Sequence, residues 1–256
     1  MGTMDSDLDL ARRAALAGAA VGMRYFAALA DLPHEVKADG SIVTEADRAV
    51  EHAIRAVLAD ACPGDAILGE EGGESGGGAR RRWIIDPIDG TALFVAGDDR
   101  WLVLVALEDD GEMVTGVAVH PAQGRIWWAG RGAGAYEAEI GGPGRRLTVP
   151  DDRPDVLTQS RIAVIPTDPV IGVPLIALVP DLPWTVHPGL MVARGDLDLA
   201  VQTAGQLWDF AATSLIVEEA GGRYHNLAGG TSPAPGSSLY ARSEPLAKQA
   251  LSVLLG

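Results

Sequence analysis

The sequence of 256 residues predicts a layered architecture in which helices pack on mixed β-sheets. Residues 44–61 repeat apolar side chains at the helical period, with Thr44 as N-cap and Asp47 three residues later as its capping-box partner. Short apolar runs at residues 83–85 and 101–107 are typical of buried strands instead. Because the two kinds of pattern are interspersed along the chain, they favour αβ layers over a helix bundle or a β-sandwich.

The remaining elements follow in chain order. We expect helices over residues 7–30, 45–61 and 209–220, strands at 66–68, 83–85, 101–107, 162–165 and 197–202, and a hairpin formed by 113–119 and 125–129. The last of these helices would begin at an acidic N-cap, Asp209, and end at Gly221-Gly222.

Two segments without regular patterns divide this series. Residues 72–78 contain five glycines and predict a mobile loop. Residues 149–155 contain two prolines and three acids. They mark the expected boundary between an N-terminal α+β half, residues 1–150, and a C-terminal α/β half, residues 151–256.

The formal net charge of −15 argues against a nucleic-acid partner, because no broad basic surface is available to displace counterions. No apolar run approaches the roughly 20 residues that cross a bilayer, and the first ten residues carry acids where a signal peptide needs bases. We therefore expect a soluble cytoplasmic protein without a membrane partner. The single cysteine, Cys62, fits a reducing compartment and is interpreted as a small buried hydrophobe.

The most informative motif is the hexapeptide Asp86-Pro87-Ile88-Asp89-Gly90-Thr91, which follows the Trp-Ile-Ile strand pattern. Pro87 fixes φ and removes a donor, so we expect the chain to turn there and bring Asp86 and Asp89 together. Adjacent carboxylates repel each other unless a cation lies between them, and hard cations prefer oxygen ligands. Gly90 and Thr91 would then open a short helix whose free N–H groups suit a phosphate.

Acids in two other segments extend this group. Glu70 lies in Gly69-Glu70-Glu71, directly after a strand pattern, and Asp209 follows Trp208 at the start of a helix pattern. Each also has an ordinary interpretation, since Asp209 could be only an N-cap and Asp47 only a capping partner. Nothing in the spacing shows that these segments converge.

Taken together, the motifs resemble the inositol monophosphatase family of lithium-sensitive, magnesium-dependent phosphatases. The matching blocks, in family order, are residues 37–47, 69–71, 83–91, 116–121, 131–136 and 208–222. The resemblance implies a layered αβαβα sugar-phosphatase-type fold, usually dimeric. It also implies a hydrolase that uses metal-activated water to release phosphate from a small soluble alcohol or sugar phosphate.

The resemblance assigns roles residue by residue. Glu70, Asp86 and the carbonyl of Ile88 would hold one Mg²⁺, and Asp86, Asp89 and Asp209 a second. Glu70 would contribute to a weaker third ion, and Mn²⁺ would substitute. Thr91 and Asp47, with Glu70, would act on the attacking water, and the backbone N–H groups of Gly90 and Thr91 would bind phosphate.

Substrate residues depart from the family pattern. Gln202 stands where inositol-type members carry a glutamate that contacts hydroxyls, and Pro183-Trp184 occupies the approximate place of a Gly-Ser segment. We interpret Trp184 and Gln202 as part of the substrate pocket. Inositol, sugar and histidinol phosphates all stay open as substrates, with histidinol-phosphate phosphatase as the alternative activity. A catalytically inactive binding homologue is the alternative of another class, and the intact acids argue against it.

Overall fold

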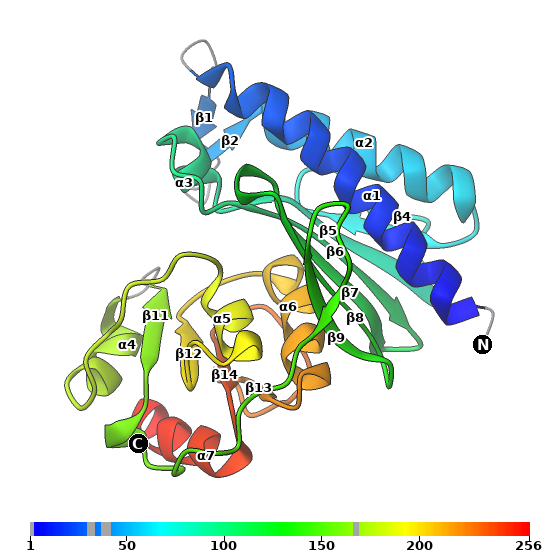
Figure 1. The fold of residues 1–256 in the computed structure, drawn as a ribbon. Helices are drawn as coiled ribbons and strands as arrows, with labels where there is room; N and C mark the ends of the chain where they lie inside the picture. Colours follow the sequence, from blue (N-terminus) through cyan, green and yellow to red (C-terminus); the bar gives the residue numbers. More distant parts are fainter. Residues whose placement is uncertain (1–2, 30–33, 37–41, 166–168) are drawn as a thin grey trace.

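The computed structural model describes residues 3–29, 34–36, 42–165 and 169–256, which form five alternating layers of helices and sheets (Figure 1). The helices are α1 (Thr3–Phe26), α2 (Glu45–Ala61), α3 (Thr91–Val95), α4 (Pro169–Ile176), α5 (Pro188–Arg194), α6 (Leu207–Glu219) and α7 (Glu244–Leu255). Short 3₁₀ turns occupy Pro121–Gln123 and Leu157–Gln159.

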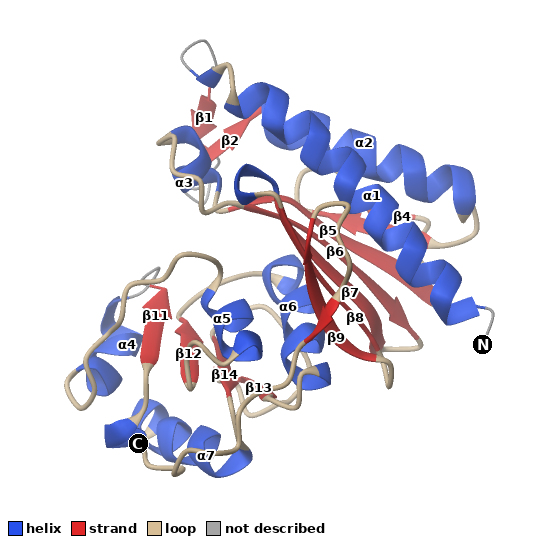
Figure 2. Ribbon diagram, viewed as in Figure 1, coloured by secondary structure: helices blue, strands red, loops and turns tan. Residues whose placement is uncertain are grey.

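Two main sheets separate the helical layers (Figure 2). The larger has the order β10-β9-β8-β7-β6-β5-β3-β4, and the smaller has the order β11-β12-β14-β13. In the larger sheet the strands are β3 (Ala66–Gly69), β4 (Gly73–Ser75), β5 (Arg81–Asp89), β6 (Leu102–Asp109), β7 (Glu112–His120), β8 (Arg125–Gly130), β9 (Gly134–Glu139) and β10 (Arg145–Arg146). In the smaller they are β11 (Ile162–Ile165), β12 (Leu199–Gln202), β13 (Arg223–Asn226) and β14 (Ser238–Ala241). A separate pair joins β1 (His34–Val36) to β2 (Ile42–Thr44).

The helices cover both faces of each main sheet. Helices α1 and α2 pack together on the outer face of the larger sheet, and α5 and α6 lie between the two sheets. Helices α4 and α7 pack together, and α7 covers the outer face of the smaller sheet. This arrangement confirms the predicted αβαβα layers. Among the helices that the structure describes, none has both the length and the apolar character of a bilayer-spanning segment.

Strict alternation along the central strands builds two cores from one sheet. Trp83 and Ile85 of β5 pack in the cluster beneath α1 and α2, whereas Ile84 between them packs in the cluster around α6. Strand β6 follows the same rule, with Leu102 and Leu104 on the α6 side. Side chains at the end of β5 that point to the same face of the sheet as Ile84 therefore reach the interior between the two sheets.

The structure confirms the capping box of α2. Asp47 Oδ2 accepts the backbone N–H of Thr44 at 2.7 Å, and Thr44 Oγ1 accepts the N–H of Ala46 at 3.0 Å. The predicted hairpin is also confirmed, because β7 pairs antiparallel with β8. The first helix begins and ends about one turn earlier than residues 7–30 suggest.

The expectation that residues 72–78 form only a loop is wrong in part, and their mobility stays a prediction. Residues Gly73–Ser75 form the edge strand β4, which pairs antiparallel with β3. Arg55 of α2 stabilises this strand, since its guanidinium donates to the carbonyl of Gly73 and to Ser75 Oγ. Glycine content alone could not reveal this support from a distant helix.

The expected N-cap role of Asp209 is also wrong. Helix α6 begins at Leu207 with Gln206 as N-cap, so Asp209 occupies the third helical position. Its carboxylate accepts the backbone N–H of Gln206, which satisfies one donor of the first turn. The helix ends at Glu219, followed by Gly221 at φ 95° as predicted from the glycine pair.

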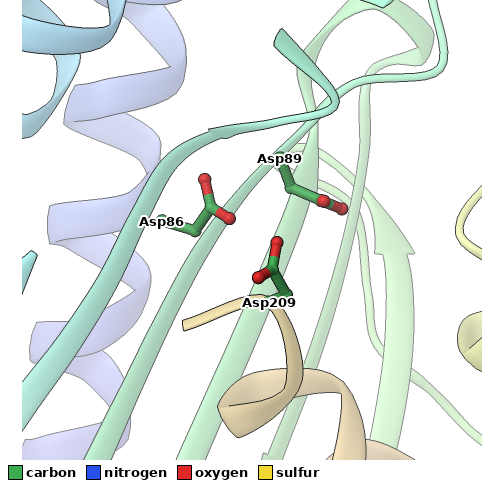
Figure 3. A group of neighbouring side chains, drawn as sticks. All are labelled: Asp86, Asp89 and Asp209. Carbon is green, nitrogen blue, oxygen red and sulfur yellow. The ribbon is translucent and has the colours of Figure 1, made fainter. Parts of the chain in front are cut away.

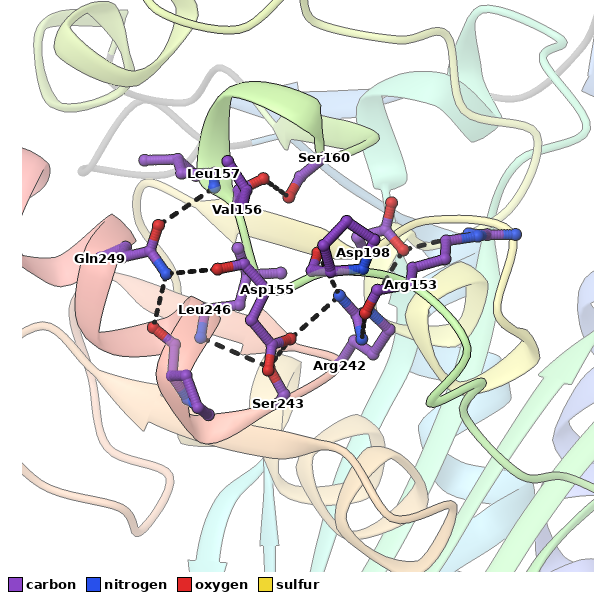
Figure 4. A network of polar contacts seen from close by, with 12 residues as sticks. Arg153, Asp155, Val156, Leu157, Ser160, Asp198, Arg242, Ser243, Leu246 and Gln249 are labelled. Carbon is purple, nitrogen blue, oxygen red and sulfur yellow. Dashed lines mark hydrogen bonds and ion pairs between the residues drawn. The ribbon is translucent and has the colours of Figure 1, made fainter.

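Beyond residue 150 the chain is held to the smaller sheet by a polar network (Figure 4). Arg153 and Arg242 both contact the buried carboxylate of Asp198, at 3.1 and 3.3 Å. Gln249 of α7 donates to the carbonyl of Asp155 and accepts from the N–H of Leu157. The network follows residues 149–155, whose role as a boundary between halves stays a prediction. Helices α4, α5 and α7 and strands β13 and β14 have no counterpart in the elements expected from sequence.

Helix α6 approaches the larger sheet closely at Gly116 of β7, where a Cβ would lie 2.7 Å from the carbonyl oxygen of Ala212. We expect Gly116→Ala to force the two layers apart and to lower the free energy of unfolding by about 1–3 kcal/mol. Urea unfolding measures this loss. Gly130→Ala is the control, because a Cβ there meets its nearest neighbour at 3.5 Å. Equal stability of both variants would contradict the tight α6–β7 contact.

Candidate metal and phosphate site

The end of β5 contains an irregularity that orients two aspartates alike. Asp86 pairs with Leu104 of β6, but Asp89 pairs with Leu102, so three steps on β5 oppose two on β6. Both partners face α6, and the extra residue therefore places Asp86 and Asp89 on the same side of the sheet. The chain bulges at Pro87 while β5 continues to Asp89, which corrects the expectation that the strand ends before a turn.

A third carboxylate joins this pair from the neighbouring layer. Asp86, Asp89 and Asp209 each offer an oxygen atom, and these atoms all lie within 4.8 Å of one another. Figure 3 shows the three carboxylates converging from β5 and from the first turn of α6. Gly205 lies against Asp209, since a Cβ there would lie 3.1 Å from Asp209 Oδ2. The structure thus brings together acids that are more than 100 residues apart in sequence.

The cluster is electrostatically unfavourable without a cation. Burial, followed by the charges of Glu70, Asp209, Asp89 and Asp47, raises the pKa of Asp86 well above its ordinary value. Burial and the charges of Asp209 and Glu70 raise the pKa of Asp89 in the same way. Among the described residues, Asp86 Oδ1 is buried and has no hydrogen-bond partner. An unpaired oxygen within a set of hard carboxylate donors fits a divalent cation such as Mg²⁺.

Glu70 reaches this region from β3, the strand parallel to β5. Its backbone N–H donates to the carbonyl of Ile85 at 3.3 Å, one residue before Asp86. Its charge acts on the pKa values of both Asp86 and Asp89, so the side chain lies within electrostatic reach of the cluster. Glu70 is not one of the three acids that meet within 4.8 Å.

Thr91 and Asp47 are in direct contact beside the acids. Thr91 Oγ1 lies 3.0 Å from Asp47 Oδ1 and 3.1 Å from the carbonyl oxygen of Ile88. A hydroxyl has one proton, so these two acceptors compete for it. Asp47 is fully buried, and burial raises its pKa despite the hydrogen bonds from Thr44 and Thr91.

The chain turns at Gly90, later than the expected turn at Pro87, and directly before the short helix that the hexapeptide predicts. Gly90 has φ 88°, a left-handed conformation that glycine adopts without steric cost, and it caps α3, which begins at Thr91. The carbonyl of Gly90 accepts from Leu93 and Phe94. The first N–H groups of a helix have no partner within it and point outward from this turn.

Comparison with known proteins decides the family. A profile of the inositol monophosphatase family matches residues 4–162 and 189–254. The chain belongs to the inositol monophosphatase family. A protein of Streptomyces griseus called glucose-1-phosphate thymidylyltransferase is 40% identical over 235 residues, 88% of each chain. Histidinol-phosphatase of Mycobacterium tuberculosis is 38% identical over 221 residues, 82% of this chain and 83% of its own. The crystal structure of extragenic suppressor protein suhB from Bartonella henselae superimposes with a TM-score of 0.84 at 27% identity, covering 97% and 98% of the two chains.

In this inositol monophosphatase family member, Trp184 contacts Arg100, which precedes β6 of the larger sheet. Its ring stacks under the guanidinium of Arg100 at 4.2 Å, and its carbonyl accepts from the same group. Trp184, Arg100, Asp98 and Gln123 help to line a surface hollow of about 400 Å³ that does not include Gln202. The interpretation of Trp184 as a substrate contact stays a prediction.

Gln202 lies at the end of β12 in a fixed orientation. The N–H of Gly189 donates to His187 Nδ1 at 3.0 Å, so the proton of this imidazole is on Nε2. His187 Nε2 lies 3.0 Å from Gln202 Oε1 and therefore donates to it. Burial lowers the pKa of His187 to about 4, which keeps the ring neutral. The acceptor oxygen of Gln202 is thus already used within the protein.

Two residues around the site had no place in the sequence interpretation. His187 caps α5, and its other ring nitrogen donates the hydrogen bond that orients Gln202. Glu51 was one polar residue of a helix pattern, yet its buried carboxylate binds the segment that carries Glu70. The four-residue spacing from Asp47 to Glu51 was the available signal, because it puts both acids on one helix face.

Asp86→Asn should stabilise the metal-free protein at neutral pH. The folded-state pKa of this acid lies above its unfolded value, so its ionisation costs stability as pH rises from about 4 through the raised pKa. Thermal unfolding in chelator should show a higher Tm for the variant at pH 7 and little difference near pH 4. Mg²⁺ should raise the Tm of the wild type but not of the variant.

Asp98→Asn is a control of opposite sign. Hydrogen bonds from Arg100 lower the pKa of Asp98 to about 2. Its charge therefore contributes stability at neutral pH, and this contribution is lost as pH falls from about 4 through about 2. This variant should be slightly less stable at pH 7. An Asp86→Asn protein destabilised in chelator at pH 7 would show that the acids do not repel one another in the fold.

Proposed function

We propose that this protein is a Mg²⁺-dependent phosphomonoester hydrolase that releases phosphate from a small soluble alcohol or sugar phosphate. The observation that carries the proposal is the convergence of Asp86, Asp89 and Asp209 beside the Thr91–Asp47 pair. Mutually repelling carboxylates provide oxygen ligands for a cation, and the neighbouring hydroxyl can orient a water molecule. Family membership supports the same reaction class.

The proposed ligands would form two main cation sites. Glu70, Asp86 and the carbonyl of Ile88 would hold one ion, and Asp86, Asp89 and Asp209 a second, with Glu70 contributing to a third. Such ions screen the charge of phosphate oxygens and lower the pKa of bound water. The acidic protein would otherwise repel its anionic substrate. Mn²⁺ has similar ligand preferences and would substitute.

Residues of the chain position the reactants. If the carbonyl of Ile88 were a cation ligand, Thr91 would donate its proton to Asp47 alone. The oxygen of Thr91 could then accept a hydrogen bond from the attacking water and orient that water toward phosphorus, and the water's proton could pass to Thr91 only as Thr91 gives its own proton to Asp47. The N–H groups of Gly90 and Thr91, at the start of α3, would bind the phosphate oxygens.

Histidinol phosphate is the second candidate substrate, and the orientation of Gln202 favours it. Because His187 already donates to the amide oxygen, Gln202 would offer a ligand two N–H donors and only one remaining lone pair of a neutral acceptor. A neutral imidazole nitrogen can accept such a bond, whereas neighbouring hydroxyls of inositol lose the charged acceptor that a glutamate would offer. The Mycobacterium tuberculosis relative carries the name of this activity.

Four further properties belong to the proposal. We place the protein in the cytoplasm, as a homodimer, with residues 1–150 and 151–256 as its two halves. The net charge of −15 supports the absence of a nucleic-acid partner.

Phosphate release from p-nitrophenyl phosphate tests the reaction class. We expect turnover with Mg²⁺ or Mn²⁺ and loss of at least 100-fold in excess chelator, because cation-assisted hydrolysis has no substitute in the site. A parallel assay supplies glucose 1-phosphate and thymidine triphosphate and measures pyrophosphate, since the name of the Streptomyces griseus relative describes nucleotidyl transfer. Full turnover in chelator, or pyrophosphate as the only product, would refute the proposal.

Inositol monophosphate should be a poorer substrate than histidinol phosphate. Losing a charge-assisted hydrogen bond at a buried contact costs on the order of 1–2 kcal/mol, roughly tenfold in kcat/KM. Gln202→Glu should reverse this preference and leave p-nitrophenyl phosphate turnover unchanged. If inositol monophosphate leads in the wild type, the interpretation of Gln202 is wrong while the metal chemistry stands.

A further inference from the structure

Glu51 is a buried acid outside the carboxylate cluster, and it binds the backbone on one side of Glu70. Its side chain is 3% exposed and projects from α2 toward the turn between β3 and β4. One carboxylate oxygen accepts the N–H of Glu71 at 2.7 Å, and the other accepts the N–H of Gly72 at 2.9 Å. Both donors are backbone groups, so Glu51 fixes the path of the chain rather than any side chain.

Arg55 extends this contact along the turn. Its Nε donates to Glu51 Oε1 at 2.6 Å, and its other nitrogens donate to the carbonyl of Gly73 and to Ser75 Oγ. The guanidinium also compensates the buried charge of Glu51, which would be unfavourable alone. The two residues, one helical turn apart on α2, together hold residues 71–75.

On the other side of Glu70, the carboxylate of Glu51 lies close to the backbone of Gly69. A Cβ at Gly69 would lie 2.3 Å from Glu51 Oε1 and 2.5 Å from its carboxyl carbon. Only glycine leaves room for the carboxylate there. Glu70 therefore lies between Gly69, which packs against Glu51, and Glu71, which is hydrogen-bonded to it.

We propose that Glu51, held by Arg55, is a positioning residue that directs Glu70 toward the acid cluster. It thereby sets the affinity of the cation site to which Glu70 would contribute a ligand. This deepens the proposed function and rests on it. Cation ligands must be held to within a few tenths of an ångström, and partners that orient them alter metal affinity about 10–100-fold when removed. Glu51 acts on Glu70 through two backbone N–H groups and touches neither cation nor substrate.

The primary test is Glu51→Gln, which keeps the shape but loses the charge and one acceptor oxygen. Calorimetric titration with Mg²⁺ should show affinity falling about tenfold or more, and hydrogen exchange at Glu71 and Gly72 should accelerate. The rate with p-nitrophenyl phosphate should recover at high Mg²⁺, which a loss of folded protein would not allow. Glu74→Gln removes a charge from an exposed residue of the same hairpin and should change none of these values.

A double-mutant cycle keeps the proposal testable if Glu51→Gln folds poorly. Gly69→Ala should weaken Mg²⁺ binding in the wild type because its Cβ displaces the carboxylate, but have little effect in a Glu51→Ala background. Additive effects, or unchanged Mg²⁺ affinity in a folded Glu51→Gln protein, would overturn the role of Glu51. Wild-type protein that binds Mg²⁺ but hydrolyses no phosphomonoester would refute the proposed function separately.

Discussion

The one-residue bulge at Pro87 is the constraint on which the site depends. In a regular strand Asp86 and Asp89 would point to opposite faces, one toward α6 and one toward α1 and α2. The shift in pairing from Leu104 to Leu102 turns both toward α6, where Asp209 meets them. Proline suits this position because the bulge needs no ladder donor there. Gly90 then reverses the chain into α3 and places Thr91 beside Asp47.

This geometry brings buried acids that repel one another together, and packing of the surrounding layers holds them in place. Asp86 and Asp89 extend a strand whose preceding residues are buried on both faces, so the acids cannot separate without disturbing two cores. Helix α6 also packs closely, since Gly116 of β7 lets its backbone approach the sheet directly. The result is a rigid set of oxygen atoms whose charges a cation would balance.

Local sequence patterns predicted the parts of this site that depend on neighbouring residues. The capping box at Thr44, the turn at Gly90 and the hairpin of β7 and β8 each follow from signals within a few residues. Contacts between distant segments could not be predicted in this way. Asp209 is a residue type that is common at N-caps. Only the structure shows that it lies at the third position of α6 and meets Asp86. The roles of Glu51 and His187 likewise depend on elements far away in the chain.

The arrangement separates the residues of the proposed chemistry from those of the proposed substrate choice. Most of the acids, together with Thr91, belong to α2, α3 and the larger sheet, whereas Gln202 and His187 belong to the smaller sheet and α5. Asp209 is the exception, and it lies on α6, the helix that contacts both sheets. Residues around β12 can therefore change without moving the bulge or the carboxylates. Relatives that share this fold but carry names for different phosphate esters are what such a separation would produce.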